Sequence, residues 1–185
     1  MVHLFYTTFS SPFDTFTIVW KETDSDLRIQ RIFLSDPEHK SETIAFQFFK
    51  QINLGSSSLI RSLGEKIQRF FNGQKVEFNL GLIDFNRCYE VQKQVLLAEY
   101  EIPRGWVSTY KRIAGKIGIP KGARVVGNAL ARNPFPIIIP CHRAIRSNGE
   151  LGGFQGGMKM KRVLLEMEGI EFSDKGKVIT DKICY

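Results

Sequence analysis

The 185-residue sequence has few cysteines and no long apolar run. Its three cysteines, Cys88, Cys141 and Cys184, cannot all pair and are too few for a disulfide scaffold, which favours a reducing, intracellular compartment. No stretch approaches the roughly 18 apolar residues of a membrane span, and the N-terminal residues lack the pattern of a secretory signal. We therefore expect a cytoplasmic protein, or a nuclear one in a eukaryote, that does not contact membranes.

Metal-ligand spacing is also missing. Structural zinc sites usually use pairs of cysteine or histidine ligands separated by a few residues. Neither the three cysteines nor His3, His39 and His142 form such pairs. The sequence therefore predicts no metal and no other cofactor.

Acidic residues are absent between Glu101 and Glu150. The formal net charge is +7, and the excess lies in residues 86–185, which carry 17 basic and 9 acidic side chains against 9 and 10 in residues 1–85. A long uncompensated positive segment indicates a polyanion partner, although a solvated basic face is the alternative. Interleaving of the basic residues with glycine, alanine and apolar residues favours a folded binding surface. They are Arg104, Lys111, Arg112, Lys116, Lys121, Arg124, Arg132, Arg143 and Arg146.

The N-terminal half has the pattern of a small α/β domain, residues 1–84. Apolar and β-branched runs predict strands over residues 16–20 and 27–34, joined as a hairpin, and alternation predicts another strand over residues 75–80. Helical spacing predicts one helix beginning at an N-cap Ser41 and a second over residues 57–72. No set of residues in this half points to chemistry.

The C-terminal half, residues 85–185, has mainly helical patterns. Helices are expected over residues 91–100, 107–117 with Ser108 as the cap, 121–132 and 159–168. A tight turn at residues 118–120 separates two short helices, and the second is basic and rich in small residues. This arrangement is typical of a helix-turn-helix, although helix pairs in ordinary cores have a similar pattern.

Candidate chemistry follows these helices, in the Pro-Cys-His-Arg segment that contains Cys141. A thiol must ionise to attack, and the adjacent His142 together with Arg143 and Arg146 predicts a lowered thiol pKa. A lone cysteine is otherwise a small buried apolar residue, which is the interpretation we favour for Cys88 and Cys184. A cysteine hydrolase would also use cysteine and histidine, but it would give the basic helix pair no role.

The segment RVVGNALARNPFPIIIPCHRAI, with the glycine-rich loop and Glu168 that follow it, resembles the signature of the O6-alkylguanine-DNA alkyltransferases. The resemblance covers about residues 85–170. It implies an α/β N-terminal domain of RNase H-like fold and a mainly α C-terminal domain with a winged-helix-like helix-turn-helix. It also implies a monomer that binds double-stranded DNA through the minor groove.

The activity implied by the resemblance is that of a methylated-DNA–protein-cysteine S-methyltransferase in DNA repair. Such a protein flips O6-alkylguanine, and by extension O4-alkylthymine, out of the duplex and transfers the alkyl group irreversibly to its own cysteine. Cys141 would be the acceptor, His142 the base acting through a water, and Glu168 the group that orients His142. Asn133 would hold the active-site turn, and Tyr110 would donate to the departing guanine.

The same resemblance assigns the DNA contacts. Arg124 would take the place of the flipped nucleotide, the small residues Ala123 and Gly127 would allow close approach, and Lys111 and Ser147 would contact phosphates. Phe154 and Gln155 stand where many members carry Tyr and Ser, and Ala144 where Val is commonest. The base pocket would be formed by Leu130, Pro136, Ala144, Phe154, Gln155 and Gly156.

Two further functions are compatible with a helix-turn-helix. A damage-recognition module would bind alkylated bases without reacting, but such relatives lack the cysteine that this chain has at Cys141. A sequence-specific regulator would read bases, but a recognition helix rich in glycine and alanine offers few side chains for base readout.

Overall fold

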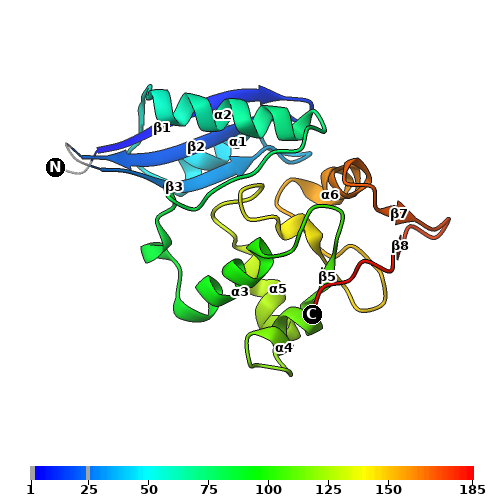
Figure 1. Cartoon of the computed structure of the whole chain (residues 1–185). Coiled ribbons are helices and arrows are strands. Elements are labelled where there is room, and N and C mark those ends of the chain that lie inside the picture. The colour runs from blue at the N-terminus through cyan, green and yellow to red at the C-terminus, as the bar shows by residue number, and fades with distance from the viewer. Residues whose placement is uncertain (1–2, 24–25) are drawn as a thin grey trace. The chain divides into compact units, whose positions relative to one another are not determined.

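The structure is a computed structural model that describes residues 3–23 and 26–185. The chain forms two compact units (Figure 1). The first contains the chain through Arg87 together with Pro134–Ile138, and the second contains Cys88–Asn133 and Ile139–Tyr185. The units thus divide slightly beyond the expected boundary at residue 84, and a short segment of the C-terminal half joins the first unit. Each unit is described by itself.

The first unit is built on a four-stranded sheet in the order β3-β2-β1-β4. Strands β1 (His3–Ser11), β2 (Asp14–Glu22) and β3 (Leu27–Leu34) pair antiparallel in sequence order, and β4 (Asn53–Leu54) adds in parallel to β1. The β-branched and aromatic residues of β2 suit a central strand because both faces of the sheet are covered there.

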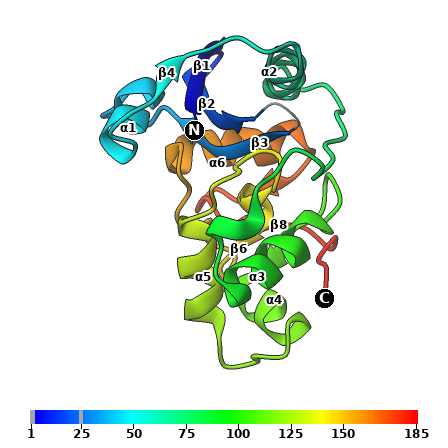
Figure 2. The same cartoon turned by 90° about the vertical axis from the view of Figure 1, so that its left-hand side faces the viewer.

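Helices α1 (Ser41–Phe48) and α2 (Ser58–Phe71) cover opposite faces of this sheet, as Figure 2 shows. Alternate residues of β2 point to opposite sides. Val19 packs in a cluster with Ala45 of α1, whereas the Phe16 ring lies 5.7 Å from that of Phe71 in α2. Residues of β2 between Phe16 and Trp20 are therefore buried on both faces.

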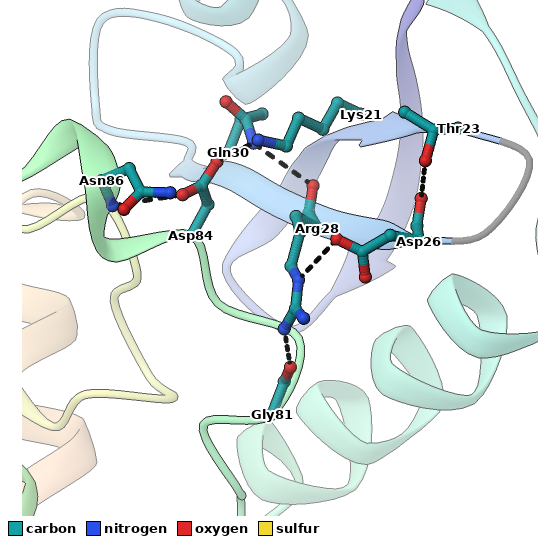
Figure 3. Close-up of polar contacts among 8 residues, drawn as sticks. All are labelled: Lys21, Thr23, Asp26, Arg28, Gln30, Gly81, Asp84 and Asn86. Carbon is teal, nitrogen blue, oxygen red and sulfur yellow. Dashed lines mark hydrogen bonds and ion pairs between the residues drawn. The ribbon is translucent and has the colours of Figure 1, made fainter. Parts of the chain in front are cut away.

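The segment after α2 is attached to the sheet by polar contacts. The buried Asp84 carboxylate accepts hydrogen bonds from Lys21 at 2.6 Å and Gln30 at 2.9 Å (Figure 3). Burial raises the pKa of Asp84, but these bonds outweigh it and hold the pKa below its usual range. Arg28 of β3 donates to the carbonyl of Gly81. These contacts hold the segment from Gly81 to Asp84 against the sheet.

Local patterns predicted part of this unit. The hairpin of β2 and β3 and the helix α2 are confirmed. The strand over residues 75–80 is wrong, because that segment has no ladder partner and runs as a loop. Ser41 is the first helical residue and not the cap, which is Lys40. Strands β1 and β4 were not predicted, because the tertiary pairing of β1 with β2 and β4 defines them.

The second unit contains four helices: α3 (Glu90–Tyr100), α4 (Tyr110–Lys116), α5 (Ala123–Ala131) and α6 (Gly157–Met167). Helices α3, α4 and α5 pack against one another. Gly118, with φ of +80°, terminates α4 in the left-handed conformation that glycine adopts without strain. All four predicted helices of this half are present.

The predicted helix over residues 107–117 begins later than expected. Ser108 and Thr109 form strand β5, which pairs in parallel with β6 (Ala144–Ile145). Thr109, and not Ser108, is the N-cap of α4, and its hydroxyl accepts a hydrogen bond from the Arg112 N–H. Pairing with β6 holds Ser108 and Thr109 in an extended conformation. Because β6 is more than thirty residues away in the chain, the local sequence pattern does not predict this pairing.

Short elements complete the second unit. The 3₁₀ turn η2 (Cys141–Arg143) leads into β6, and β7 (Glu171–Phe172) pairs antiparallel with β8 (Val178–Ile179). The second unit also contains a buried apolar cluster, formed by Val107, Ile145, Leu165 and Ile170. Residues 3–23 and 26–185 have mixed α/β content with six α-helices. In the described residues, no helix has the length and apolar character to cross a membrane.

Candidate active site

The backbone around Cys141 is held in an unusual conformation. Ile137 has φ of +74°, which a β-branched residue adopts only under strain. Pro140 has φ −80° and ψ 57°, and the Cys141 N–H bonds to the Ile139 carbonyl at 2.8 Å, which together define an inverse γ-turn. The thiol therefore sits at the start of η2, directly after Pro140, whose ring restricts the backbone there.

Cys141 lies at the wall of a pocket of about 180 Å³ in the second unit. Cys141 is only 5% exposed, so little of it is open to solvent. Tyr110 from α4 and the loop that carries Gly152 form other walls, and a Cβ at Gly152 would come within 2.4 Å of the Tyr110 hydroxyl. The complete lining is Tyr110, Gly127, Leu130, Ala131, Cys141, Arg146, Gly152, Gly153 and Phe154.

Burial dominates the electrostatics of the thiol. It raises the pKa of Cys141 to about 12, against the lowering effects of a hydrogen bond with Asn133 and of the charge on Lys161. The expectation of a lowered pKa is wrong here. Arg143 is engaged elsewhere, and Arg146 forms an exposed ion pair with Glu150. Cys141 is therefore a neutral thiol at neutral pH.

His142, Glu168 and Arg143 form a buried network. The His142 Nε2 lies 3.0 Å from Glu168 Oε1, and both side chains are fully buried. Arg143 donates to both carboxylate oxygens, from Nε at 2.9 Å and from Nη2 at 2.8 Å. This bidentate pair fixes the carboxylate and leaves one oxygen facing the imidazole.

The protonation state of this network follows from its geometry. Burial raises the pKa of Glu168, but the hydrogen bonds and charges of His142 and Arg143 outweigh it and lower the pKa to about 2. Burial lowers the pKa of His142 despite the neighbouring carboxylate. A neutral imidazole beside a carboxylate carries its proton on Nε2, so the lone pair of the ring is on Nδ1, the nitrogen that can accept a proton.

Asn133 and Tyr110 approach the thiol from other directions. Asn133 donates from Nδ2 to the Ile139 carbonyl at 3.1 Å and also bonds to Cys141. Burial, together with the charges of Glu99 and Cys141, raises the pKa of Tyr110 to about 12. Tyr110 therefore keeps its proton at neutral pH and can donate a hydrogen bond to an anion that forms in the pocket.

The other predicted residues fall into two groups. Of the predicted pocket residues, Leu130 and Phe154 line the cavity together with Gly127, whereas Pro136, Ala144, Gln155 and Gly156 do not line it. Ala144 instead lies in β6, directly after the thiol turn. Three predicted DNA contacts are exposed: Lys111 on α4, Arg124 on α5 and Ser147 after β6, while Ala123 begins α5 half-buried.

Two charged residues near the thiol were not predicted. Glu99 of α3 and Lys161 of α6 are both 0% exposed and both act electrostatically on Cys141. A signal was present: Lys161 stands three and four residues before the buried Leu164 and Leu165, on the core face of the helix. In the described residues, His, Cys, Asp and Glu side chains form no group of three or more that could hold a metal ion.

The comparisons with known proteins agree with this site. Residues 90–170 match the family model described as the DNA binding domain of 6-O-methylguanine DNA methyltransferase. The methylated-DNA–protein-cysteine methyltransferase of Methanothermobacter thermautotrophicus is 48% identical over 111 residues, which cover 60% of this chain and 62% of that protein. The match therefore spans less than two thirds of that relative.

Solved structures extend the similarity over both units. The O6-methylguanine methyltransferase of Mycobacterium tuberculosis aligns with a TM-score of 0.69 and 32% identity, covering 91% of this chain and 93% of that one. The same mycobacterial protein in complex with DNA aligns with a TM-score of 0.66 and 30% identity, over 88% and 91% of the two chains. The fold and the site therefore define a class of protein: a DNA-binding domain with a cysteine at the wall of a pocket. The chain belongs to the methylated-DNA–protein-cysteine methyltransferase family.

Proposed function

We propose that this protein repairs DNA by moving an alkyl group from the O6 atom of guanine to the sulfur of Cys141. The observation that carries the proposal is Cys141 at the wall of a base-sized pocket, next to a His142 held by Glu168. The name of the relatives and the DNA-bound mycobacterial structure support it. O4-alkylthymine is a second substrate under the same proposal.

The chemistry begins with removal of the thiol proton. Because the resting thiol is neutral, His142 accepts this proton through a water as the sulfur attacks. The bond from sulfur to the alkyl carbon forms while the bond from that carbon to O6 breaks. The electron pair leaves on the guanine, and the Tyr110 hydroxyl stabilises the resulting anion by donating a hydrogen bond to it. The thioether is stable, so each molecule reacts once.

DNA binding places the damaged base in the pocket. The alkylated O6 lies inside a base pair, so the nucleotide must rotate out of the helix, at a cost of a few kcal/mol. Arg124, exposed near the start of α5, would occupy the vacated space. Ala123 and Gly127 keep α5 narrow enough for close approach through the minor groove, and Lys111 and Ser147 contact phosphates.

The finer architecture fits this use. We propose that α4 and α5, joined by the turn at residues 117–122, form the helix-turn-helix, with a winged-helix-like arrangement in the second unit. The first unit, with helices on both faces of its sheet, would be an RNase H-like supporting domain. The protein would act as a monomer inside the cell, in the cytoplasm or the nucleus.

Intact mass spectrometry tests the reaction. After incubation with duplex DNA containing O6-methylguanine, the protein gains the mass of one methyl group, and Cys141→Ser gains none. Tight binding of the lesion without a mass gain would identify a damage-recognition module instead. Preference for a particular sequence, with indifference to the lesion, would identify a regulator.

A second experiment tests the role of Arg124. Arg124→Ala is expected to slow methyl transfer from duplex DNA far more than transfer from a free O6-alkylguanine base, because only the duplex requires a side chain to fill the gap. Equal loss on both substrates would contradict this role. Single-turnover rates measured with each substrate give the comparison.

A further inference from the structure

Glu99 is a carboxylic acid in the interior of the second unit. It is 0% exposed, and no side chain in the described part of the chain makes a hydrogen bond of normal geometry to its carboxyl oxygens. The backbone N–H of Ala144, directly after the thiol turn, favours its ionised form. A buried carboxyl group with so few partners is costly to keep in the core. The reaction proposed above gives Glu99 no task, so its position calls for another explanation.

Lys161 is the matching basic group. It is 0% exposed, and its Nζ donates to the carbonyl of Ala144 at 2.6 Å and to that of Gly153 at 3.3 Å. Ala144 follows the thiol turn, and Gly153 lines the pocket. One ammonium group thus connects the two segments that border Cys141.

Both residues stand on helices that contact the turn carrying the thiol, and both act on it through their charge. Helix α3, which carries Glu99, and helix α6, which carries Lys161, each pack against η2. A negative charge on Glu99 opposes the Cys141 thiolate, and the positive charge on Lys161 favours it, with Glu99 the stronger of the two.

We propose that Glu99 and Lys161, two buried ionisable groups that both interact with the backbone of Ala144, together control how readily the Cys141 thiol becomes an alkyl acceptor. Transfer is favoured while Glu99 holds its proton and Lys161 keeps its charge, and disfavoured once Glu99 ionises. Both act as positioning residues, since they work through Cys141 and do not touch the substrate. The inference rests on the proposed alkyl transfer to Cys141 and adds that buried ionisable groups regulate its rate.

The titration of the pair lies close to neutral pH. Burial raises the pKa of Glu99 to about 8, against the lowering effects of Lys161 and Arg143. Burial lowers the pKa of Lys161 to about 8, although the charges of Cys141 and Glu99 oppose this. Just above neutral pH the pair loses a proton, and the net positive charge that faces the thiol disappears.

Other titratable groups around the pair come from every neighbouring element. Arg143 acts on Glu99 and His142, Arg146 acts on Lys161 and Tyr110, and Glu99 also acts on the C-terminal segment. The groups to be considered in any pH profile are Tyr110, Cys141, His142, Arg143, Arg146, Glu168, Cys184 and Tyr185. Comparing each variant with the unchanged protein at every pH cancels contributions that they share.

The variant Glu99→Gln keeps the shape of the side chain but cannot become negative. The ratio of its methyl-transfer rate to that of the unchanged protein is expected to rise by about threefold or more between about pH 6.5 and about pH 9, since one pKa unit changes the thiolate fraction tenfold. The matched control is Glu101→Gln, which removes an exposed acid paired with Lys116 near the end of the same helix. Its ratio is expected to stay flat.

Two substrates separate the possible failures. Rates are measured with a free O6-alkylguanine base and with iodoacetamide, using peptide mass mapping to follow Cys141 alone. Alkylation by iodoacetamide without transfer from O6-alkylguanine in the unchanged protein would overturn the proposed function. A flat Glu99→Gln ratio with both reagents would overturn the control by Glu99 and Lys161 while leaving the proposed function intact.

A measurement on the unchanged protein covers the case in which Glu99→Gln does not fold. Carboxyl ¹³C NMR of glutamate-labelled protein is expected to show one buried glutamate titrating above pH 7, and the signal is expected to shift once Cys141 is methylated. If every glutamate except Glu168 titrated near its ordinary value of about 4.3, the proposal would be wrong.

Discussion

At the scale of single residues, two buried groups of the site have pKa values shifted in opposite directions. Burial raises the pKa of both Cys141 and Glu168, but only Glu168 has partners strong enough to reverse the shift. Cys141 has one hydrogen bond from an amide and stays a thiol, with its pKa raised. Glu168 is held by an arginine fork and an imidazole and stays a carboxylate, with its pKa lowered. The site at rest is therefore charged in the network behind the thiol and neutral at the reacting atom.

Glu168→Gln is expected to lower both stability and activity. Removing one member of a buried ion pair leaves Arg143 without its carboxylate, at a cost of about 3–5 kcal/mol. Loss of an oriented base should slow methyl transfer by about a hundredfold or more. Urea unfolding and single-turnover kinetics measure the two effects.

The control is Glu166→Gln, two residues away. Glu166 pairs with Arg162 on the exposed face of α6, where such pairs contribute about 0.5 kcal/mol or less. Both variants remove one carboxylate, so only burial distinguishes them. Equal effects of the two substitutions would mean that the buried network has no special role.

Acid should destabilise the protein through the same carboxylate. An unfolded glutamate takes up its proton near pH 4.3, whereas Glu168 in the folded protein does so at about 2, so the unfolded chain binds more protons between these values. Stability is expected to fall by about 3 kcal/mol as the pH drops from about 5 to about 2. The lowered pKa of His142 has the same sign and adds a loss that begins near pH 6.5.

Urea unfolding at a series of pH values tests this expectation. Glu168→Gln should have a smaller loss of stability between pH 5 and 2 than the unchanged protein, although its stability at pH 7 is lower. An identical acid dependence in both proteins would show that other carboxylates cause the loss.

At the scale of elements, α5 combines two requirements that conflict. Helices gain stability from alanine over glycine, yet Gly127 lies in the middle of α5 and lines the pocket. A Cβ at this position would meet nothing within 4 Å. The glycine is therefore not explained by packing inside the protein, which agrees with a surface that another molecule must approach closely.

Gly127→Ala should consequently stabilise the protein and impair transfer. The free energy of unfolding is expected to rise by about 0.5–1 kcal/mol, while methyl transfer from duplex DNA slows. The control is Gly115→Ala in α4, where a Cβ also meets nothing within 4 Å and which does not line the pocket. Unimpaired transfer by Gly127→Ala would argue against close approach of DNA at this helix.

At the scale of the whole molecule, charge is divided between the two halves of the sequence. The net charge of +7 arises in residues 86–185, which supply nearly all of the second unit. Under the proposed function, this positive charge would attract DNA from a distance and make its binding strongly dependent on salt. The first unit contributes no comparable excess.

The salt dependence of DNA binding tests this division. Lys111→Ala should weaken binding to all sequences alike and reduce the slope of log affinity against log salt by about 0.9, the value for one lost phosphate contact. Lys50→Ala, which removes an exposed charge from the first unit, should leave the slope unchanged. Equal slopes for both variants would place the phosphate contacts elsewhere. Fluorescence anisotropy over a range of salt concentrations gives both slopes.

The sequence by itself determined the helices of the second unit, the central hairpin of the first and the cysteine segment, because periodicity and short motifs are local properties. It also indicated which half carries the positive charge. Only the tertiary structure decided the partners of β1 and β5, the loop at residues 75–80 and the membership of Pro134–Ile138 in the first unit. It likewise decided that Cys141 is a neutral thiol and that Glu99 and Lys161 are buried beside it. Strand pairing and desolvation depend on segments that are distant in the chain, so no local pattern contains them.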